Sequence, residues 1–182
     1  MIRLVLLLSM LSLGSMTFAQ DAEDTPKAIE AEQPMTYERL GKIIFALDPD
    51  AQPRGPGFEL SVAGVPIIVV TDPVADRMRA MVPIRRADAL TSEDMQRMMQ
   101  ANFDSALDAR YAIANGTLWA AFIHPLSPLE KDQFISGLAQ TVNIAKTYGT
   151  LYSGGAAQYG GGDSGNLQRA LIEELLKKGE EI

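Results

Sequence analysis

The chain has 182 residues, of which 23 are acidic and 16 basic, and its formal net charge at pH 7 is −7. This acidic balance argues against general binding to nucleic acid or to an anionic membrane surface, because both need a basic patch. Cysteine is absent and histidine occurs once, so no disulfide framework and no Cys/His metal site can form. We therefore expect no cofactor and no metal.

Residues 1–19 have the three parts of a secretory signal peptide. Arg3 supplies a positive start, residues 4–13 form an apolar run, and Thr17 and Ala19 place small residues before a cut at Gln20. A membrane-spanning helix needs about 20 predominantly apolar residues, and this run is shorter. We expect cleavage rather than anchoring, a periplasmic location, and no membrane span in the mature chain.

Residues 20–34 are polar and charged, which predicts a flexible leader. Thr36 can cap a helix whose apolar side chains recur at helical spacing as far as Leu47, where Asp48-Pro49 ends it. The breaker-rich residues 48–57 predict a loop. Period-2 alternation then predicts three strands. They cover Phe58–Val62, Val65–Thr71 and Arg77–Ile84, with a turn at Ala63-Gly64 between the first two.

A second helix is predicted from Thr91 or Ser92, with an apolar stripe of Met95, Met98, Met99, Phe103 and Ala106. Methionines are also frequent in the neighbouring strand, at Met78 and Met81. Flexible thioethers suit adaptable binding surfaces, although simple filling of the core is the alternative explanation.

The strongest local signal is Asn115-Gly116 between two β-prone runs, which predicts a two-residue hairpin loop. In that register Tyr111 pairs with Ala120 and Ile113 with Leu118 on one face, while Ala112 pairs with Trp119 on the other. Both faces are apolar. We therefore expect helices on one side of the sheet and a partner subunit on the other.

Ser127, Pro128 and Glu130 predict the start of a third helix, with Ser127 as N-cap and Glu130 completing a capping box. Its apolar side is Phe134, Leu138, Val142, Ala145 and Tyr148, and Gly149 is expected to end it. Residues 153–165 are a Gly-rich linker by composition, and residues 166–178 can form an amphipathic helix.

The predicted fold is α+β, in the order α-β-β-β-α-β-β-α, with an antiparallel sheet packed against helices and a C-terminal helix after the linker. The chain divides into a signal peptide (1–19), a leader (20–34), a domain (35–152), the linker (153–165) and a tail helix (166–182).

This order of motifs resembles the type III secretion chaperone-like fold, which includes the Tir-chaperone and YbjN families. The resemblance covers residues 35–152, and the signal peptide and the tail helix are additions to it. It is carried by Leu47-Asp48-Pro49, Ala63-Gly64, Met95–Asn102, Asn115-Gly116 and Pro125-Leu126-Ser127. It implies a homodimer that binds a segment of another protein through apolar strand and helix surfaces.

Few residues suit catalysis. His124 is the only histidine, at the end of a predicted strand, where a capping or surface role is typical. Gly162-Asp163-Ser164-Gly165 matches the letters around a chymotrypsin-like nucleophile, but no histidine lies in a matching context. The loop carboxylates Asp48, Asp50, Asp72 and Asp76 match no EF-hand spacing. A hydrolase using such carboxylates is the least favoured of three hypotheses, and we predict that the chain is not an enzyme.

The favoured hypothesis is an exported, non-enzymatic protein-binding module, chaperone- or adaptor-like. Its partner is a protein segment or an envelope protein, and the chain itself is a homodimer. The predicted binding residues are Met95, Met99, Phe103, Trp119 and Phe122. The alternative is a structural or regulatory subunit of an envelope complex that docks through its C-terminal helix.

Overall fold

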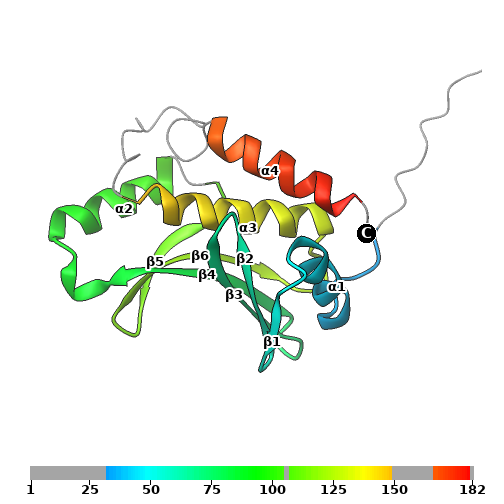
Figure 1. Cartoon of the computed structure of the whole chain (residues 1–182). Helices are drawn as coiled ribbons and strands as arrows, with labels where there is room; N and C mark the ends of the chain where they lie inside the picture. Colours follow the sequence, from blue (N-terminus) through cyan, green and yellow to red (C-terminus); the bar gives the residue numbers. More distant parts are fainter. Residues whose placement is uncertain (1–31, 105–106, 149–165, 181–182) are drawn as a thin grey trace, which may run out of the picture. The chain divides into compact units, whose positions relative to one another are not determined.

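The computed structural model describes residues 32–104, 107–148 and 166–180. The fold is α+β, and apart from the additional strand β1 and a short 3-10 helix its elements follow the predicted order (Figure 1). The elements are α1 (Tyr37–Leu47), β1 (Gln52–Arg54), β2 (Gly57–Val62), β3 (Val65–Asp72), β4 (Arg77–Arg86), the 3-10 helix η1 (Ala87–Ala89), α2 (Ser92–Asp104), β5 (Arg110–Ala114), β6 (Thr117–Pro125), α3 (Lys131–Lys146) and α4 (Asn166–Gly179).

The strands form one open antiparallel sheet in the order β1-β2-β3-β4-β6-β5. Strands β1 to β4 are successive antiparallel neighbours. After α2 the chain returns as the β5–β6 hairpin, and β6 pairs with β4. This arrangement leaves β1 and β5 as the two edges of the sheet.

The hairpin register is the predicted one. Asn115 and Gly116 have φ angles of 50° and 70°, as a turn of this kind requires. Tyr111 lies opposite Ala120, Ile113 opposite Leu118, and Ala112 opposite Trp119.

The start of the domain is also as predicted, except for one strand. The side chain of Thr36 accepts a hydrogen bond from the backbone N–H of Arg39 and caps α1. Residues 48–57 were expected to be a loop, but Gln52–Arg54 forms the edge strand β1. All three residues of β1 are exposed and the middle one is Pro53, so the alternation that marks a strand is missing here.

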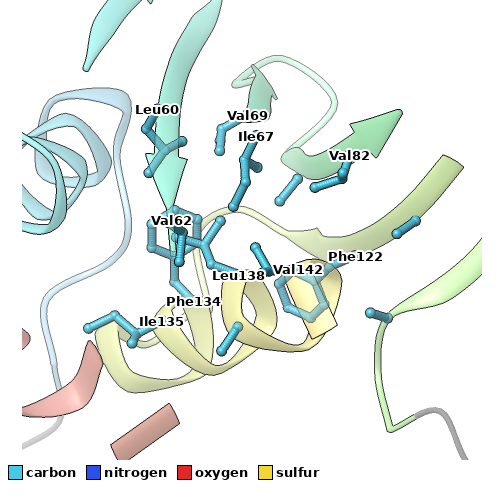
Figure 2. Packing of buried hydrophobic residues seen from close by; sticks show 14 of the residues in the cluster. Leu60, Val62, Ile67, Val69, Val82, Phe122, Phe134, Ile135, Leu138 and Val142 are labelled. Carbon is cyan, nitrogen blue, oxygen red and sulfur yellow. The ribbon is translucent and has the colours of Figure 1, made fainter. Parts of the chain in front are cut away.

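Helix α3 lies across one face of the sheet and forms the centre of the core (Figure 2). Phe134, Leu138 and Val142 are fully buried there. Gly137 lets the helix approach closely, since a Cβ at this position would lie 2.5 Å from the ring of Phe122 on β6. The strands contribute Leu60, Val62, Ile67, Val69, Met78, Ala80, Val82, Leu118 and Ala120 to the same core.

The start of α3 differs from the prediction. Its N-cap is Glu130, which forms a capping box with Gln133, and the helix begins at Lys131. Ser127 does not cap it, because both its backbone N–H and its hydroxyl donate to the carboxylate of Asp76, at 2.6 and 2.9 Å. These bonds tie the β3–β4 turn to the segment before α3.

Three of the predicted segments lie wholly or mostly outside the described residues: the signal peptide (1–19), the leader (20–34) except residues 32–34, and the linker (153–165). The tail helix is present as α4, and it packs on α3 and α1. Among the residues that the structure describes, none of the helices has the length and apolarity needed to cross a membrane.

Asp76→Asn should lower the free energy of unfolding at pH 7. The hydrogen bonds from Ser127, above all the one from its backbone N–H, lower the pKa of Asp76. A lowered folded-state pKa contributes stability above the unfolded-state pKa, and this stability is lost as the pH falls through the folded-state pKa. The difference between the variant and the wild type should therefore shrink between pH 7 and about pH 3.

Urea titrations at both pH values measure this difference, with Asp50→Asn as the control. Asp50 is an exposed residue whose carboxylate makes none of the hydrogen bonds found among the described residues. An equal loss of stability for both variants, or one that does not change with pH, would contradict the proposed role of Asp76.

Gly137→Ala should destabilise the fold by about 1–3 kcal/mol, because the new methyl group collides with the ring of Phe122. Phe122→Leu alone is also destabilising, since it removes buried apolar atoms. In the double variant the smaller leucine side chain relieves the collision with the new methyl group. The double variant should therefore lose less stability than the sum of the losses of the two single variants. Additive losses in chemical denaturation would show that the two residues do not meet.

Candidate functional site

The second helix begins with a well-formed cap. The backbone N–H and the hydroxyl of Thr91 donate to the carboxylate of Asp94 at 2.9 and 2.8 Å, and the backbone N–H of Asp94 donates back to the Thr91 hydroxyl. The bond from the Thr91 backbone is the main reason that the pKa of Asp94 is lowered. The cap fixes the direction in which α2 leaves η1.

Helix α2 is attached to β5 by few groups. Met98 and Ala101 are its buried apolar side chains. The side chain of Asn102 forms two hydrogen bonds with the backbone of Tyr111, accepting from its N–H at 2.8 Å and donating to its carbonyl at 3.1 Å. Asn102 thereby occupies part of the free edge of β5, where another strand would otherwise pair.

Next to these buried residues, α2 also carries large apolar side chains that are exposed to solvent. Met99 is 59% exposed and Phe103 is 71% exposed, and Met95 lies one turn earlier on the same side. The described residues contain eight exposed large apolar side chains, and five of them belong to α2, to β5 or to the connection between the two. We call this set the α2–β5 patch: Met95, Met99, Phe103, Leu107 and Ile113.

An apolar hollow of about 260 Å³ lies within this patch, between α2 and β5. Its walls are almost entirely carbon and sulfur. They are formed by Met95, Met98, Met99, Tyr111, Ala112, Ile113 and Leu118. A hollow of this size and lining accepts one or two apolar side chains rather than a charged group.

The β5 side of the patch has a rigid base. The side-chain carbonyl of Gln140, a buried residue of α3, accepts from the backbone N–H groups of Asp108 and Ala109 at 2.7 and 3.2 Å. The hydroxyl of Tyr111 donates to the carbonyl of Ile144 at 2.9 Å. The start of β5 is thus fixed to α3, while the outer side of α2 stays open.

The structure brings together three of the five predicted binding residues, Met95, Met99 and Phe103. Trp119 points to the opposite face of the sheet, where its indole N–H donates to the carbonyl of Ala114. Phe122 is 3% exposed and packs against Gly137 of α3. A binding role for the five residues stays a prediction.

Leu107 and Ile113 were not predicted as part of the site. The hairpin register already places Ile113 on the same face as Tyr111, so this residue was within reach of sequence reasoning. Leu107 lies in the connection between α2 and β5, and no periodic pattern marks it.

The predicted methionine cluster divides into separate groups. Met95, Met98 and Met99 line the same hollow, whereas Met78 is buried in the core. Met81 lies on the other face of the sheet. The predicted cluster is therefore split between an apolar hollow, the core and the other face of the sheet, and a binding role for the methionines at the hollow stays a prediction.

The sheet face opposite α3 bears no helix among residues 32–104, 107–148 and 166–180 (Figure 1). The registers place Ile68, Met81 and Ala121 in one row of this face and Val70, Arg79 and Ile123 in the next. This is the face that the sequence assigned to a partner subunit. Its apolar side chains are mostly half-buried among their neighbours, and only Ile123 is strongly exposed.

His124 shows no catalytic arrangement with the groups around it. It lines a hollow together with Asp132 and Ser136, but its Nδ1 lies 2.8 Å from the carbonyl oxygen of Pro125 and its ring stacks on Phe122. Within the described ranges no hydrogen bond joins it to either residue. The loop carboxylates of Asp48 and Asp72 accept backbone N–H bonds and so act as turn formers.

No family model and no curated protein matches the chain. Two solved structures are similar to it in fold. The crystal structure of the ExsC–ExsE complex aligns with a TM-score of 0.47 and 12% identity, over 63% of this chain and 93% of that chain. The structure of the HopA1–SchA chaperone–effector complex aligns with a TM-score of 0.46 and 8% identity, over 60% and 91%.

Two adjacent methionines of α2 should respond very differently to truncation. Met98→Ala removes a side chain that is 2% exposed and should cost about 2–5 kcal/mol of stability. Met99→Ala removes an exposed side chain and should change stability by less than about 0.5 kcal/mol. Thermal and urea denaturation of the two variants measure the contrast. Equal losses would mean that Met99 belongs to the core.

Proposed function

We propose that this chain is a non-enzymatic protein-binding module, chaperone- or adaptor-like, which holds an apolar segment of another protein against the α2–β5 patch. The observation that carries the proposal is that three exposed large apolar side chains, Met95, Met99 and Ile113, line one apolar hollow, with the exposed Phe103 one turn beyond Met99 on α2. On a soluble domain, contiguous exposed apolar surface of this kind marks an interaction site.

The chemistry of the patch supports a segment with varied apolar side chains. Met95 and Met99 are unbranched and flexible, so they can adapt to different partner side chains. Phe103 offers a large flat surface with little conformational entropy to lose. The Gln140 and Tyr111 hydrogen bonds keep the β5 side in place, which reduces the cost of ordering the site on binding.

We further propose that the mature chain acts in the periplasm as a homodimer. The pattern of residues 1–19 supports export. The uncovered sheet face with Ile68, Met81 and Ile123 offers a second subunit an apolar surface that is separate from the α2–β5 patch. Light scattering of the purified mature chain measures the oligomeric state.

The alternative, an envelope subunit that docks through its C-terminal helix, requires a change in the structure. The apolar side of α4 faces α3 and α1, with Leu175 buried in the core cluster. Another protein can bind the apolar side of α4 only after α4 has separated from α3 and α1.

Met99→Asp and Phe103→Asp should each reduce capture of a partner from periplasmic extract by at least about tenfold, because each places a carboxylate in an apolar contact. Both variants should keep their stability, since both positions are exposed. Capture is measured by affinity purification of the exported, tagged chain followed by quantitative mass spectrometry.

Val74→Asp is the matched control. Val74 is 99% exposed and lies in the turn between β3 and β4, away from the patch. It should capture the same proteins in the same amounts as the wild type. If all three variants capture equally, or if all three lose capture, the α2–β5 patch is not the binding site.

A further inference from the structure

The two edge strands of the sheet differ in how readily another strand can pair with them. An edge strand presents a row of backbone N–H and C=O groups, and natural proteins protect such edges against association. Strand β1 has three residues with Pro53 at its centre, and short length and proline both oppose pairing. Strand β5 has five residues, no proline and the β-prone side chains of Tyr111 and Ile113. It therefore needs protection of another kind.

The backbone groups of β5 that point away from β6 belong to alternate residues. In an antiparallel strand the N–H and C=O of one residue point to one side, and those of the next residue point to the other. Tyr111 points away from β6, because its N–H and its C=O both meet the side chain of Asn102. Ile113, two residues further along the strand, therefore points the same way. The free edge of β5 consists of the backbone groups of these two residues.

The side chain of Asn102 takes the place that a residue of a neighbouring strand would occupy. Its Oδ1 accepts from the N–H of Tyr111 at 2.8 Å, and its Nδ2 donates to the C=O of Tyr111 at 3.1 Å. Opposite residues of an antiparallel pair exchange the same two hydrogen bonds. The asparagine amide can form both, because it carries an acceptor and a donor on one planar group. Another strand cannot form these bonds while Asn102 holds them.

Gln140 of α3 occupies the backbone groups just before β5 in a similar way. Its Oε1 accepts from the N–H groups of Asp108 and Ala109, and its Nε2 donates to the Asp108 carboxylate and the Ser136 hydroxyl, both at 3.1 Å. Of the two outward-pointing residues of β5, only Ile113 has no hydrogen-bond partner for its backbone among the described residues. Because the net contribution of one hydrogen bond is small, Ile113 alone does not hold a second strand.

We propose that Asn102 protects the edge of β5, and that without it β5 pairs with β5 of a second copy of this chain. A second copy is the one strand donor present wherever the chain itself is present. A two-fold axis between two β5 strands lets the backbone groups of Tyr111 and Ile113 pair with those of the other copy. Without Asn102, the buried side chains that still hold α2 are Met98 and Ala101, and neither bonds to the edge. This role of Asn102 does not rest on the proposed function.

The test compares two substitutions of Asn102 in the full chain. Asn102→Ala removes both hydrogen bonds and leaves the edge open. Asn102→Asp also loses the donor to the C=O of Tyr111, and so weakens the attachment of α2, but it places a charge at the edge, which opposes pairing. In sedimentation velocity over a concentration series, Asn102→Ala should associate beyond the assembly of the wild type, with a dissociation constant at least about tenfold lower. Asn102→Asp should have the same mass as the wild type.

A proline at the edge separates strand pairing from the loosening of α2. Ile113→Pro removes an N–H that points away from β6, and proline is tolerated at such positions. The variant Asn102→Ala/Ile113→Pro should return to the mass of the wild type, although α2 is not reattached. Amide hydrogen exchange gives a second readout, since the N–H of Ile113 should exchange rapidly in the wild type and become protected when Asn102→Ala associates.

The proposal is overturned if Asn102→Ala associates no more tightly than the wild type. It is also overturned if Asn102→Asp associates equally, or if Ile113→Pro does not reverse the association, since the association then comes from the apolar side chains of a loosened α2. Circular dichroism checks that each variant is folded, and Asn102→Ser replaces Asn102→Ala in every comparison if the alanine variant does not fold. None of these measurements uses a partner protein, so the proposed function keeps its own test.

Discussion

The close contact between α3 and the sheet is the constraint on which the other features of the domain depend. Gly137 allows the helix to lie directly on the ring of Phe122, and Phe134, Leu138 and Val142 fill the space between the helix and the strands. From this position α3 fixes the start of β5 through Gln140 and Ile144, and it presents Ile135 and Ala139 to α4. The candidate site and the tail helix therefore both depend on the position of α3.

Local signals in the sequence predicted the elements whose causes are local. Thr36 caps α1 with its own side chain, and Asn115-Gly116 sets the hairpin register because the turn fixes the pairing of the strands. The predicted N-cap of α3, Ser127, was wrong because of a contact between residues that are far apart in the sequence. The hydroxyl of Ser127 is taken by Asp76, which is 51 residues away in the sequence and close only after β3 and β4 have formed.

Only part of the candidate site could be predicted, again because non-local contacts decide which side chains are buried. Helical spacing showed that Met95, Met99 and Phe103 share a side of α2 with Met98, but it gave no sign of which of them the sheet would cover. Trp119 and Phe122 are three positions apart on β6, so their side chains lie on opposite faces of the sheet and only one of them can face α3. Which one it is follows from the position of Gly137, and the contact between an apolar strand residue and a helical glycine has no signature in the sequence.

The proposed function requires that a protein segment contacts the exposed side chains of α2. Site-specific photo-crosslinking tests it most directly, with a photoreactive residue placed at Phe103 in the exported chain and, as a matched control, at Val74. If a segment binds there, position 103 should give a specific crosslinked protein and position 74 none, although both positions are exposed. Crosslinks of equal yield from the two positions, or no crosslink from position 103 while Ile123 on the uncovered sheet face gives one, would contradict it.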